Sequence, residues 1–131
     1  LSKPATEAAR WNVQTNRVDN IELARLSAEE MTAAMAKERP FRRLAHLKQA
    51  LDDYQFDTLL VDPPRAGLDA ATLKLASTFQ RVLYISCSPE TLSQNLATLS
   101  ETHSIQSLAF FDQFPYTPHL ESGVILTRRS L

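Results

Sequence analysis

Cys87 is the only cysteine among the 131 residues, and its setting is that of a possible nucleophile. It follows the apolar run 82–85, typical of a buried strand, and precedes Ser88-Pro89, a pair that commonly starts a helix. The positive end of a helix dipole favours the thiolate, the nucleophilic form of cysteine. Cysteine is also among the most buried residue types. From its position alone, Cys87 is either a nucleophile or a core thiol.

A second polar segment, Asp62-Pro63-Pro64-Arg65, follows residues 56–61, which are predicted to form a buried strand. Asp62 is expected to be a rigidly held acceptor at the carboxyl end of a strand, where open α/β sheets bind ligands. The alternative is a turn or cap aspartate. Arg65 could contact a phosphate or pair with a surface carboxylate.

Glu121 precedes the last apolar run and could act as a general base or be a solvated side chain. Phe114 and Tyr116 could stack on a nucleic-acid base, or belong to the core.

The three histidines have no metal-ligand spacing, and one cysteine excludes a multi-cysteine zinc site, so no metal is predicted. We expect His103 and His119 at the surface. His46, near a basic run, is expected on a solvated face, with contact to an RNA backbone as the alternative.

Helix and strand patterns alternate along the chain. Helices are predicted over residues 4–16, 27–37, 44–51, 67–79 and 89–99, and strands over 21–26, 56–61, 82–85, 104–112 and 123–127. This alternation predicts an α/β fold with a mostly parallel sheet. The last two strands are joined without a helix, so one of them should run antiparallel.

The composition, with 44% apolar and 22% charged residues, is that of an ordinary globular protein. The net charge of -1 indicates no overall electrostatic attraction for nucleic acid, although a local basic patch suffices for phosphate contacts. Two glycines are too few for a glycine-rich nucleotide loop. We see no membrane span and no signal peptide, so we expect a cytoplasmic protein.

Three longer motifs, residues 61–68, 84–92 and 111–124, together resemble the RNA uracil-5-methyltransferase family, above all its tRNA-modifying bacterial members. The family commonly has asparagine where Ser88 stands. The resemblance implies a Rossmann-like class I methyltransferase sheet and S-adenosyl-L-methionine as methyl donor. It implies 5-methyluridine formation in RNA, with the tRNA T-loop uridine as substrate. Cys87 would attack uracil carbon 6, Glu121 would be the general base, and Asp62 would lie on the cofactor side.

The family's cofactor site uses a glycine-rich loop after its first strand, which this chain lacks. Residues 1–131 are therefore expected to form the carboxyl-terminal portion of a single catalytic domain, without its first strands. Alone, they should neither bind S-adenosyl-L-methionine tightly nor methylate RNA. Edges left unpaired near Leu23 and Leu60 should pair with each other or drive self-association.

Two other functions remain open. An amino-methyltransferase of adenine or guanine also places a proline-proline turn here, but usually follows it with an aromatic residue where this chain has Arg65. A non-catalytic RNA-binding module would retain RNA binding after replacement of Cys87 or Glu121.

Overall fold

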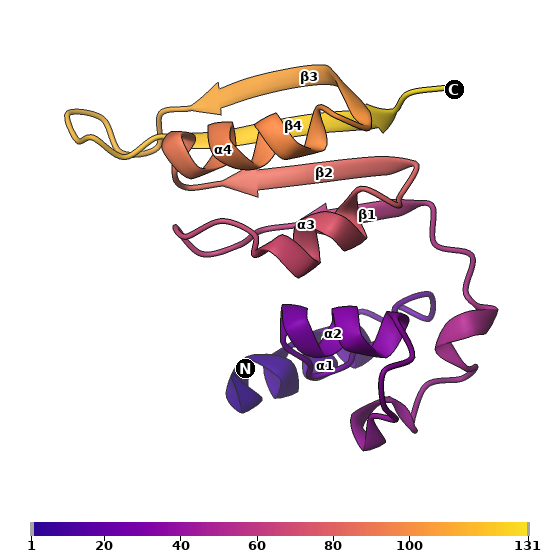
Figure 1. The fold of residues 1–131 in the computed structure, drawn as a ribbon. Helices are drawn as coiled ribbons and strands as arrows, with labels where there is room; N and C mark the ends of the chain where they lie inside the picture. The colour runs from indigo at the N-terminus through magenta and orange to yellow at the C-terminus, as the bar shows by residue number, and fades with distance from the viewer. Residues whose placement is uncertain (1, 131) are drawn as a thin grey trace. The chain divides into compact units, whose positions relative to one another are not determined.

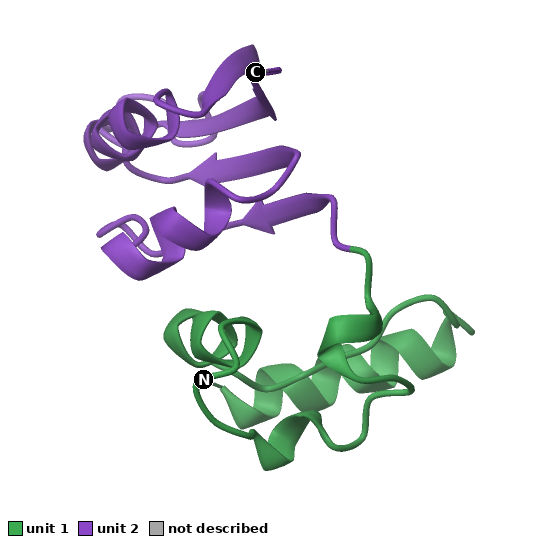
Figure 2. Cartoon of the chain, turned by 45° about the vertical axis from the view of Figure 1, so that its right-hand side comes forward, with its two compact units in different colours: residues 1–55 green, residues 56–131 purple. Residues whose placement is uncertain are grey.

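The computed structural model describes residues 2–130, which divide between Gln55 and Phe56 into a first and a second compact unit (Figure 2). Each unit is described by itself. No helix within the described part of the chain is long and apolar enough to cross a membrane.

The first unit contains two capped α-helices. Helix α1 spans Lys3–Thr15, with the Ser2 hydroxyl accepting a hydrogen bond from the Ala5 amide and Pro4 in the first turn. Helix α2 spans Ala28–Met35 and begins with the predicted capping box. In this box the Ser27 hydroxyl accepts a hydrogen bond from the Glu30 amide, and the Glu30 carboxylate accepts one from the Ser27 amide. Both helices confirm the sequence prediction to within about two residues.

Two other predictions for this unit are wrong. Residues 21–27 form no strand, and the helix expected over 44–51 is replaced by two short 3-10 turns, η1 (Arg42–Leu44) and η2 (Leu51–Asp53). Residues 21–27 and residues 43–46 are joined by hydrogen bonds instead. The Arg43 side chain donates to the Arg25 carbonyl at 2.8 Å, and the His46 side chain donates to the Leu23 carbonyl at 2.7 Å. Side chains, and not a neighbouring strand, satisfy these backbone groups.

The second unit is built on a four-stranded sheet in the order β1-β2-β4-β3 (Figure 1). The strands are β1 (Thr58–Val61), β2 (Arg81–Ser86), β3 (His103–Phe111) and β4 (Glu121–Arg128). The pair β1–β2 is parallel, and β4 runs antiparallel to both β2 and β3. Three strands thus share one direction and the carboxyl-terminal strand opposes them, which confirms the predicted sheet.

Helices α3 (Ala70–Ala76) and α4 (Pro89–Leu99) cover the same face of this sheet (Figures 1 and 2). Alternate strand residues face them, and the core consists of buried apolar side chains from both layers. Its largest fully buried members are Tyr84, Leu99, Leu126, Val82 and Val124. Truncating a core leucine such as Leu99 to alanine costs about 2–5 kcal/mol in comparable cores.

The opposite face of the sheet carries exposed apolar side chains, among them Leu60, Ile85, Ile125 and Phe111. Strand β1 pairs only with β2 among the described residues, so an edge near Leu60 is exposed as expected. The edge expected near Leu23 does not exist, because no strand forms there. Self-association through the remaining edge stays a prediction.

Candidate active site

Cys87 lies in the tight turn that joins β2 to α4. The Ser86 hydroxyl closes this turn: it accepts from the Ser88 amide at 3.1 Å and donates to the Ser88 carbonyl at 3.0 Å. Helix α4 begins at Pro89, as predicted, but the Ser88 hydroxyl makes no cap hydrogen bond and lies 3.2 Å from Glu90 Oε2. The Cys87 side chain is half-buried, so it is neither a core thiol nor fully exposed.

Glu121 is the first residue of β4. The antiparallel pairing of β2 with β4 ends with Ser86 opposite Ser122, both of which are buried. Cys87 directly follows Ser86 and Glu121 directly precedes Ser122, so both residues lie at the same end of this ladder. Because neighbouring side chains alternate between faces, Glu121 belongs to the face that α3 and α4 do not cover.

Cys87 and Glu121 line one cavity of about 330 Å³ together with Arg65, Phe114 and His119. The sequence prediction had named four of these five residues. A thiol, a carboxylate, a guanidinium and an imidazole around one space can supply a nucleophile, a base and hydrogen-bond donors.

Arg65 reaches this cavity from a turn that α4 holds in place. The turn closes with a 2.8 Å hydrogen bond from the Gly67 amide to the Pro64 carbonyl, and the Thr91 hydroxyl donates to the Arg65 carbonyl. Gly67 has a φ of 75°, in the left-handed region that glycine adopts without a Cβ penalty. The position of Arg65 therefore depends on the contact between this turn and α4.

Asn95 of α4 is the buried anchor of the same turn. Its Oδ1 accepts hydrogen bonds from the Leu68 amide at 2.8 Å and from the Tyr84 hydroxyl at 2.7 Å. Burial raises the pKa of Tyr84, which keeps the hydroxyl protonated as a donor. One amide thus connects the turn, the helix and strand β2.

His119 is exposed, as expected from the sequence, and the structure also places it in the cavity. The side chain is exposed, but its Nδ1 accepts a hydrogen bond from the Arg65 guanidinium. Its ring meets that of Phe114 edge to face, with centroids 6.3 Å apart. The sequence signal for this position was that His119 lies two residues before Glu121, because side chains two residues apart face the same way in an extended chain.

Two predicted site residues do not line this cavity. Tyr116 is fully exposed, with a φ of 64°, on the loop between β3 and β4. Asp62 is exposed at the carboxyl end of β1. The roles predicted for both residues remain predictions.

His103 was also expected at the surface, and that prediction is wrong. The residue is fully buried, with Nε2 2.9 Å from the Phe79 carbonyl and Nδ1 2.8 Å from the Thr102 hydroxyl. Pairing of both ring nitrogens makes its burial tolerable. No group of residues suited to hold a metal ion occurs among residues 2–130.

Comparison with protein families gives a match over residues 1–129 to the tRNA (uracil-5-)-methyltransferase family model. A tRNA/tmRNA (uracil-C(5))-methyltransferase of Neisseria meningitidis serogroup B is 55% identical over 131 residues, all of this chain. A protein of the same name from Acinetobacter baumannii is 55% identical over 128 residues. The chain spans only 36% of the length of each.

A solved structure is also similar to this chain. It is the Pyrococcus abyssi tRNA (uracil-54, C5)-methyltransferase in complex with S-adenosyl-L-homocysteine. The TM-score is 0.68 at 31% sequence identity, and the match covers 96% of this chain and 27% of that one.

Proposed function

The chain belongs to the tRNA (uracil-5-)-methyltransferase family, and from this premise we propose that it supplies the nucleophile and the base for methylating carbon 5 of a uridine in RNA. We take the T-loop uridine of tRNA as the substrate, in line with the names of its relatives. The observation that carries the proposal is the meeting of Cys87 and Glu121 in one cavity.

Cys87 is proposed to activate the uracil ring by covalent addition. Carbon 5 of uracil is a poor nucleophile. Attack of the Cys87 thiolate on carbon 6 forms a carbon–sulfur bond and moves the electrons of the C5–C6 double bond toward O4, giving an enolate with carbanion character at carbon 5. S-adenosyl-L-methionine, when bound, supplies an electrophilic methyl group for that carbon.

Glu121 is proposed to complete the reaction as the general base. Once carbon 5 carries both a methyl group and its original proton, the Glu121 carboxylate removes that proton. The electron pair re-forms the C5–C6 double bond, the bond from carbon 6 to Cys87 Sγ breaks, and the thiolate leaves. The place of both residues in one cavity suits a base and a nucleophile that work on adjacent ring carbons.

Arg65 and His119 are proposed to stabilise charge on the uracil. Because the guanidinium of Arg65 donates to His119 Nδ1, a neutral His119 carries its proton on Nε2. An Nε2–H group in this cavity is a suitable donor to the carbonyl oxygen that gains charge when Cys87 adds. Phe114 offers an aromatic edge for a base that has left its stack.

Asp62 is the residue of this chain that is proposed to contact the cofactor. Its exposed carboxylate, at the carboxyl end of β1, fits a hydrogen-bond acceptor for a cationic amino group. The two glycines serve the turn after Pro64 and strand β4, so neither forms a nucleotide loop. We therefore propose that these residues alone bind S-adenosyl-L-methionine weakly and do not methylate RNA.

The test is covalent capture of RNA in the full-length protein. In the presence of S-adenosyl-L-methionine, RNA with 5-fluorouridine at the target position should form an adduct stable to denaturing electrophoresis, because the fluorine on the methylated carbon 5 cannot be removed as a proton. Cys87→Ala should abolish the adduct, whereas Ser88→Ala, beside it, should retain it. An undiminished adduct in Cys87→Ala would overturn the proposed nucleophile.

A further inference from the structure

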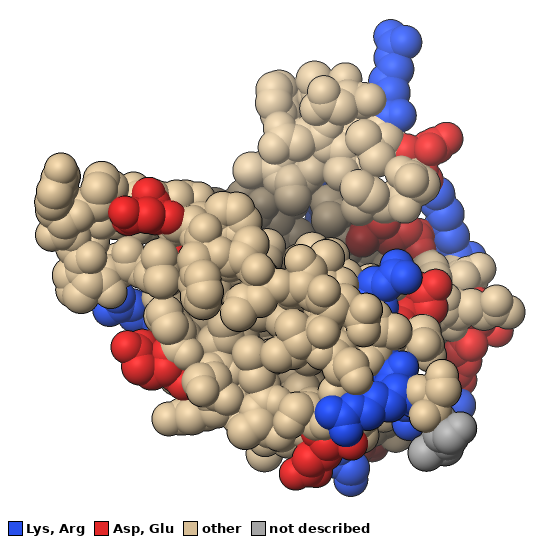
Figure 3. All heavy atoms as spheres, turned by 90° about the horizontal axis from the view of Figure 1, so that it is seen from above, with Lys and Arg blue, Asp and Glu red and all other residues tan. Residues whose placement is uncertain are grey.

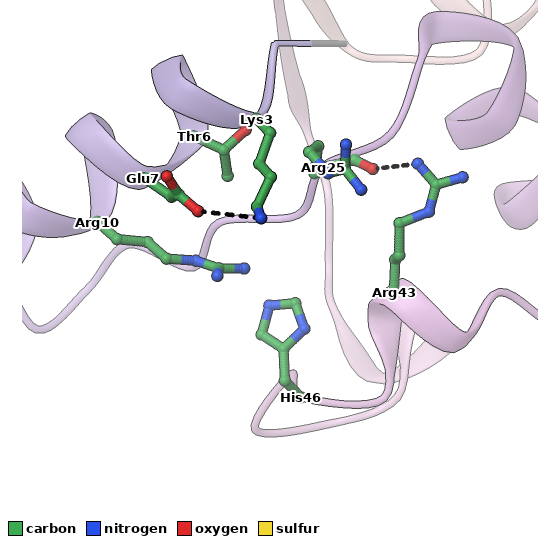
Figure 4. A pocket seen from close by; sticks show the side chains of 7 residues that line it. All are labelled: Lys3, Thr6, Glu7, Arg10, Arg25, Arg43 and His46. Carbon is green, nitrogen blue, oxygen red and sulfur yellow. Dashed lines mark hydrogen bonds and ion pairs between the residues drawn. The ribbon is translucent and has the colours of Figure 1, made fainter.

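A second cavity, of about 290 Å³, lies wholly within the first unit and is lined mainly by cations (Figure 4). Its lining residues are Lys3, Thr6, Glu7, Arg10, Arg25, Arg43 and His46. The proposed catalytic chemistry uses none of them.

One wall of this cavity is a single face of α1. Lys3, Thr6, Glu7 and Arg10 are spaced three and four residues apart, which places them along one side of the helix. In Figure 4 the Lys3 and Arg10 side chains extend from the helix toward the same space as the His46 ring. Two cationic groups from α1 thus converge on one point.

The opposite wall is held by hydrogen bonds to the backbone. The Arg43 guanidinium donates to the Arg25 carbonyl at 2.8 Å and to Glu30 Oε1 at 2.5 Å. His46 Nε2 donates to the Leu23 carbonyl at 2.7 Å, which leaves Nδ1 for another partner. The cavity is therefore formed by hydrogen-bonded chain segments as well as by surface side chains.

The charges that line the cavity are unbalanced. Four cations face one carboxylate, Glu7, which pairs with Lys3 at 3.7 Å; exposed pairs of this kind are weak. Arg43 forms an ion pair with Glu30. The hydrogen bond from the Ser27 amide, together with the nearby Arg43, lowers the pKa of Glu30. Among the described residues, Arg10 and Arg25 form no ion pair.

On the face shown in Figure 3, charges of the two signs intermingle. The face in Figure 3 is dominated by uncharged atoms, with acidic and basic side chains mixed among them. Residues 1–55 carry nine Lys and Arg against eight Asp and Glu, so the unit as a whole is almost neutral. The excess of positive charge at this cavity is local.

We propose that this cavity binds a phosphodiester group of the RNA backbone, with Arg10 and Arg25 as its free guanidinium groups. A guanidinium donates two parallel hydrogen bonds that match phosphate oxygens, and such contacts position an RNA without reading its sequence. The identity of the anion as RNA rests on the proposed function; the site itself recognises phosphate.

The test is RNA binding by the 131-residue chain, measured by fluorescence anisotropy with a T-arm stem-loop RNA and with an oligo(A) strand. Arg10→Gln and Arg25→Gln should each weaken binding of both RNAs about fivefold at low salt. Each should also lower the slope of log affinity against log salt by about 0.7–0.9. Arg42→Gln, a matched charge loss on η1 outside the cavity, should change affinity less than about twofold.

A variant that gains affinity excludes misfolding as the cause. Glu7→Gln removes the one carboxylate among the described residues that line the cavity and should strengthen RNA binding about twofold or more, whereas Glu38→Gln, outside the cavity, should not. Equal effects of Arg10→Gln and Arg42→Gln, a loss confined to the T-arm RNA, or no RNA binding by the unaltered chain would each overturn the phosphate site.

Failure of this site is distinguishable from failure of the proposed function. If Arg10→Gln binds RNA normally while the full-length protein still forms the Cys87 adduct, only the phosphate site is wrong. If Arg10→Gln weakens RNA binding but no adduct forms at Cys87, the phosphate site stands and the covalent mechanism is wrong.

Discussion

Cys87 and Glu121 line one cavity at the end of the β2–β4 ladder: Cys87 directly follows Ser86, and Glu121 directly precedes Ser122, the residue opposite Ser86. Their proximity thus depends on the register of the two strands. A slip of one residue would turn the side chain of Glu121 toward the helix-covered face, because side chains alternate along a strand. The antiparallel direction of β4 brings the start of one strand to the end of the other, and so places a base beside a nucleophile.

Glu121→Gln should separate the two halves of the proposed reaction. Glutamine keeps the size of the side chain but cannot take the proton from carbon 5, so the thiolate cannot leave. We expect full-length protein with this change to accumulate a covalent complex with ordinary uridine RNA, visible on denaturing gels, while turnover falls on the order of 10²-fold or more. Asp112→Asn, a carboxylate outside the cavity, is the control. Normal turnover by Glu121→Gln would show that another group is the base.

Two substitutions at His119 should differ in effect. The amide of glutamine can reach the place of Nε2 and donate there, whereas the shorter asparagine mimics only the Nδ1 side that accepts from Arg65. If His119 stabilises charge on the uracil, His119→Asn should slow single-turnover methylation on the order of 10²-fold, and His119→Gln should recover part of that loss. Equal rates for the two variants would argue against a donor at Nε2.

The cysteine turn and the regions around it could be predicted closely from sequence. Helix α4 was predicted over its observed residues, because proline at its first position and the spacing of its apolar residues are local signals. Strand β2 was predicted to within one residue at each end, and the capping box at Ser27 was also predicted. Where local propensity and tertiary contacts favour the same structure, the sequence pattern alone is sufficient to predict the element.

The predictions that failed concern residues whose structure depends on contacts with residues far away in the sequence. The alternation in residues 21–26 fits a strand, but a strand needs a partner, and Arg43 and His46 take its carbonyl groups instead. His103 begins β3, and its burial depends on the Phe79 carbonyl, 24 residues away. The hydrogen bond of His119 with Arg65, 54 residues earlier, was likewise not predicted. None of these pairs has a signature within a short window of sequence.

Gly67→Ala should destabilise the second unit and displace Arg65. An added Cβ would lie 2.7 Å from Asn95 Oδ1, the acceptor that anchors the turn, and the φ of 75° is strained for alanine. We expect a loss of about 2–3 kcal/mol in the free energy of unfolding by urea denaturation. Gly123→Ala is the matched control, since its Cβ would meet only a ring carbon of Phe111, at 3.4 Å, and it should cost less. A larger loss for Gly123→Ala would contradict the proposed anchor.

The paired residues Ser86 and Ser122 should respond oppositely to alanine. The Ser122 hydroxyl is buried without a hydrogen-bond partner among the described residues, so its removal should leave stability unchanged or raise it slightly. Ser86→Ala removes both hydrogen bonds that close the cysteine turn and should cost about 1–2 kcal/mol. It should also slow formation of the Cys87 adduct. Equal stabilities of the two variants would show that the turn does not depend on the Ser86 hydroxyl.

Asp69 should make the stability of the second unit dependent on pH. It caps α3, and hydrogen bonds from the backbone and side chain of Thr72 hold the pKa of its carboxyl below the ordinary value of 3.8. A lowered pKa in the folded state gives stability that is fully present above the unfolded value and is lost as pH falls through the folded value. Asp69→Ala should cost about 1 kcal/mol at pH 7, a typical N-cap effect. The gap between the two proteins should close below about pH 4, as measured by urea denaturation across pH. A gap that stays constant down to pH 2 would show that the ionised carboxylate is not what stabilises the helix.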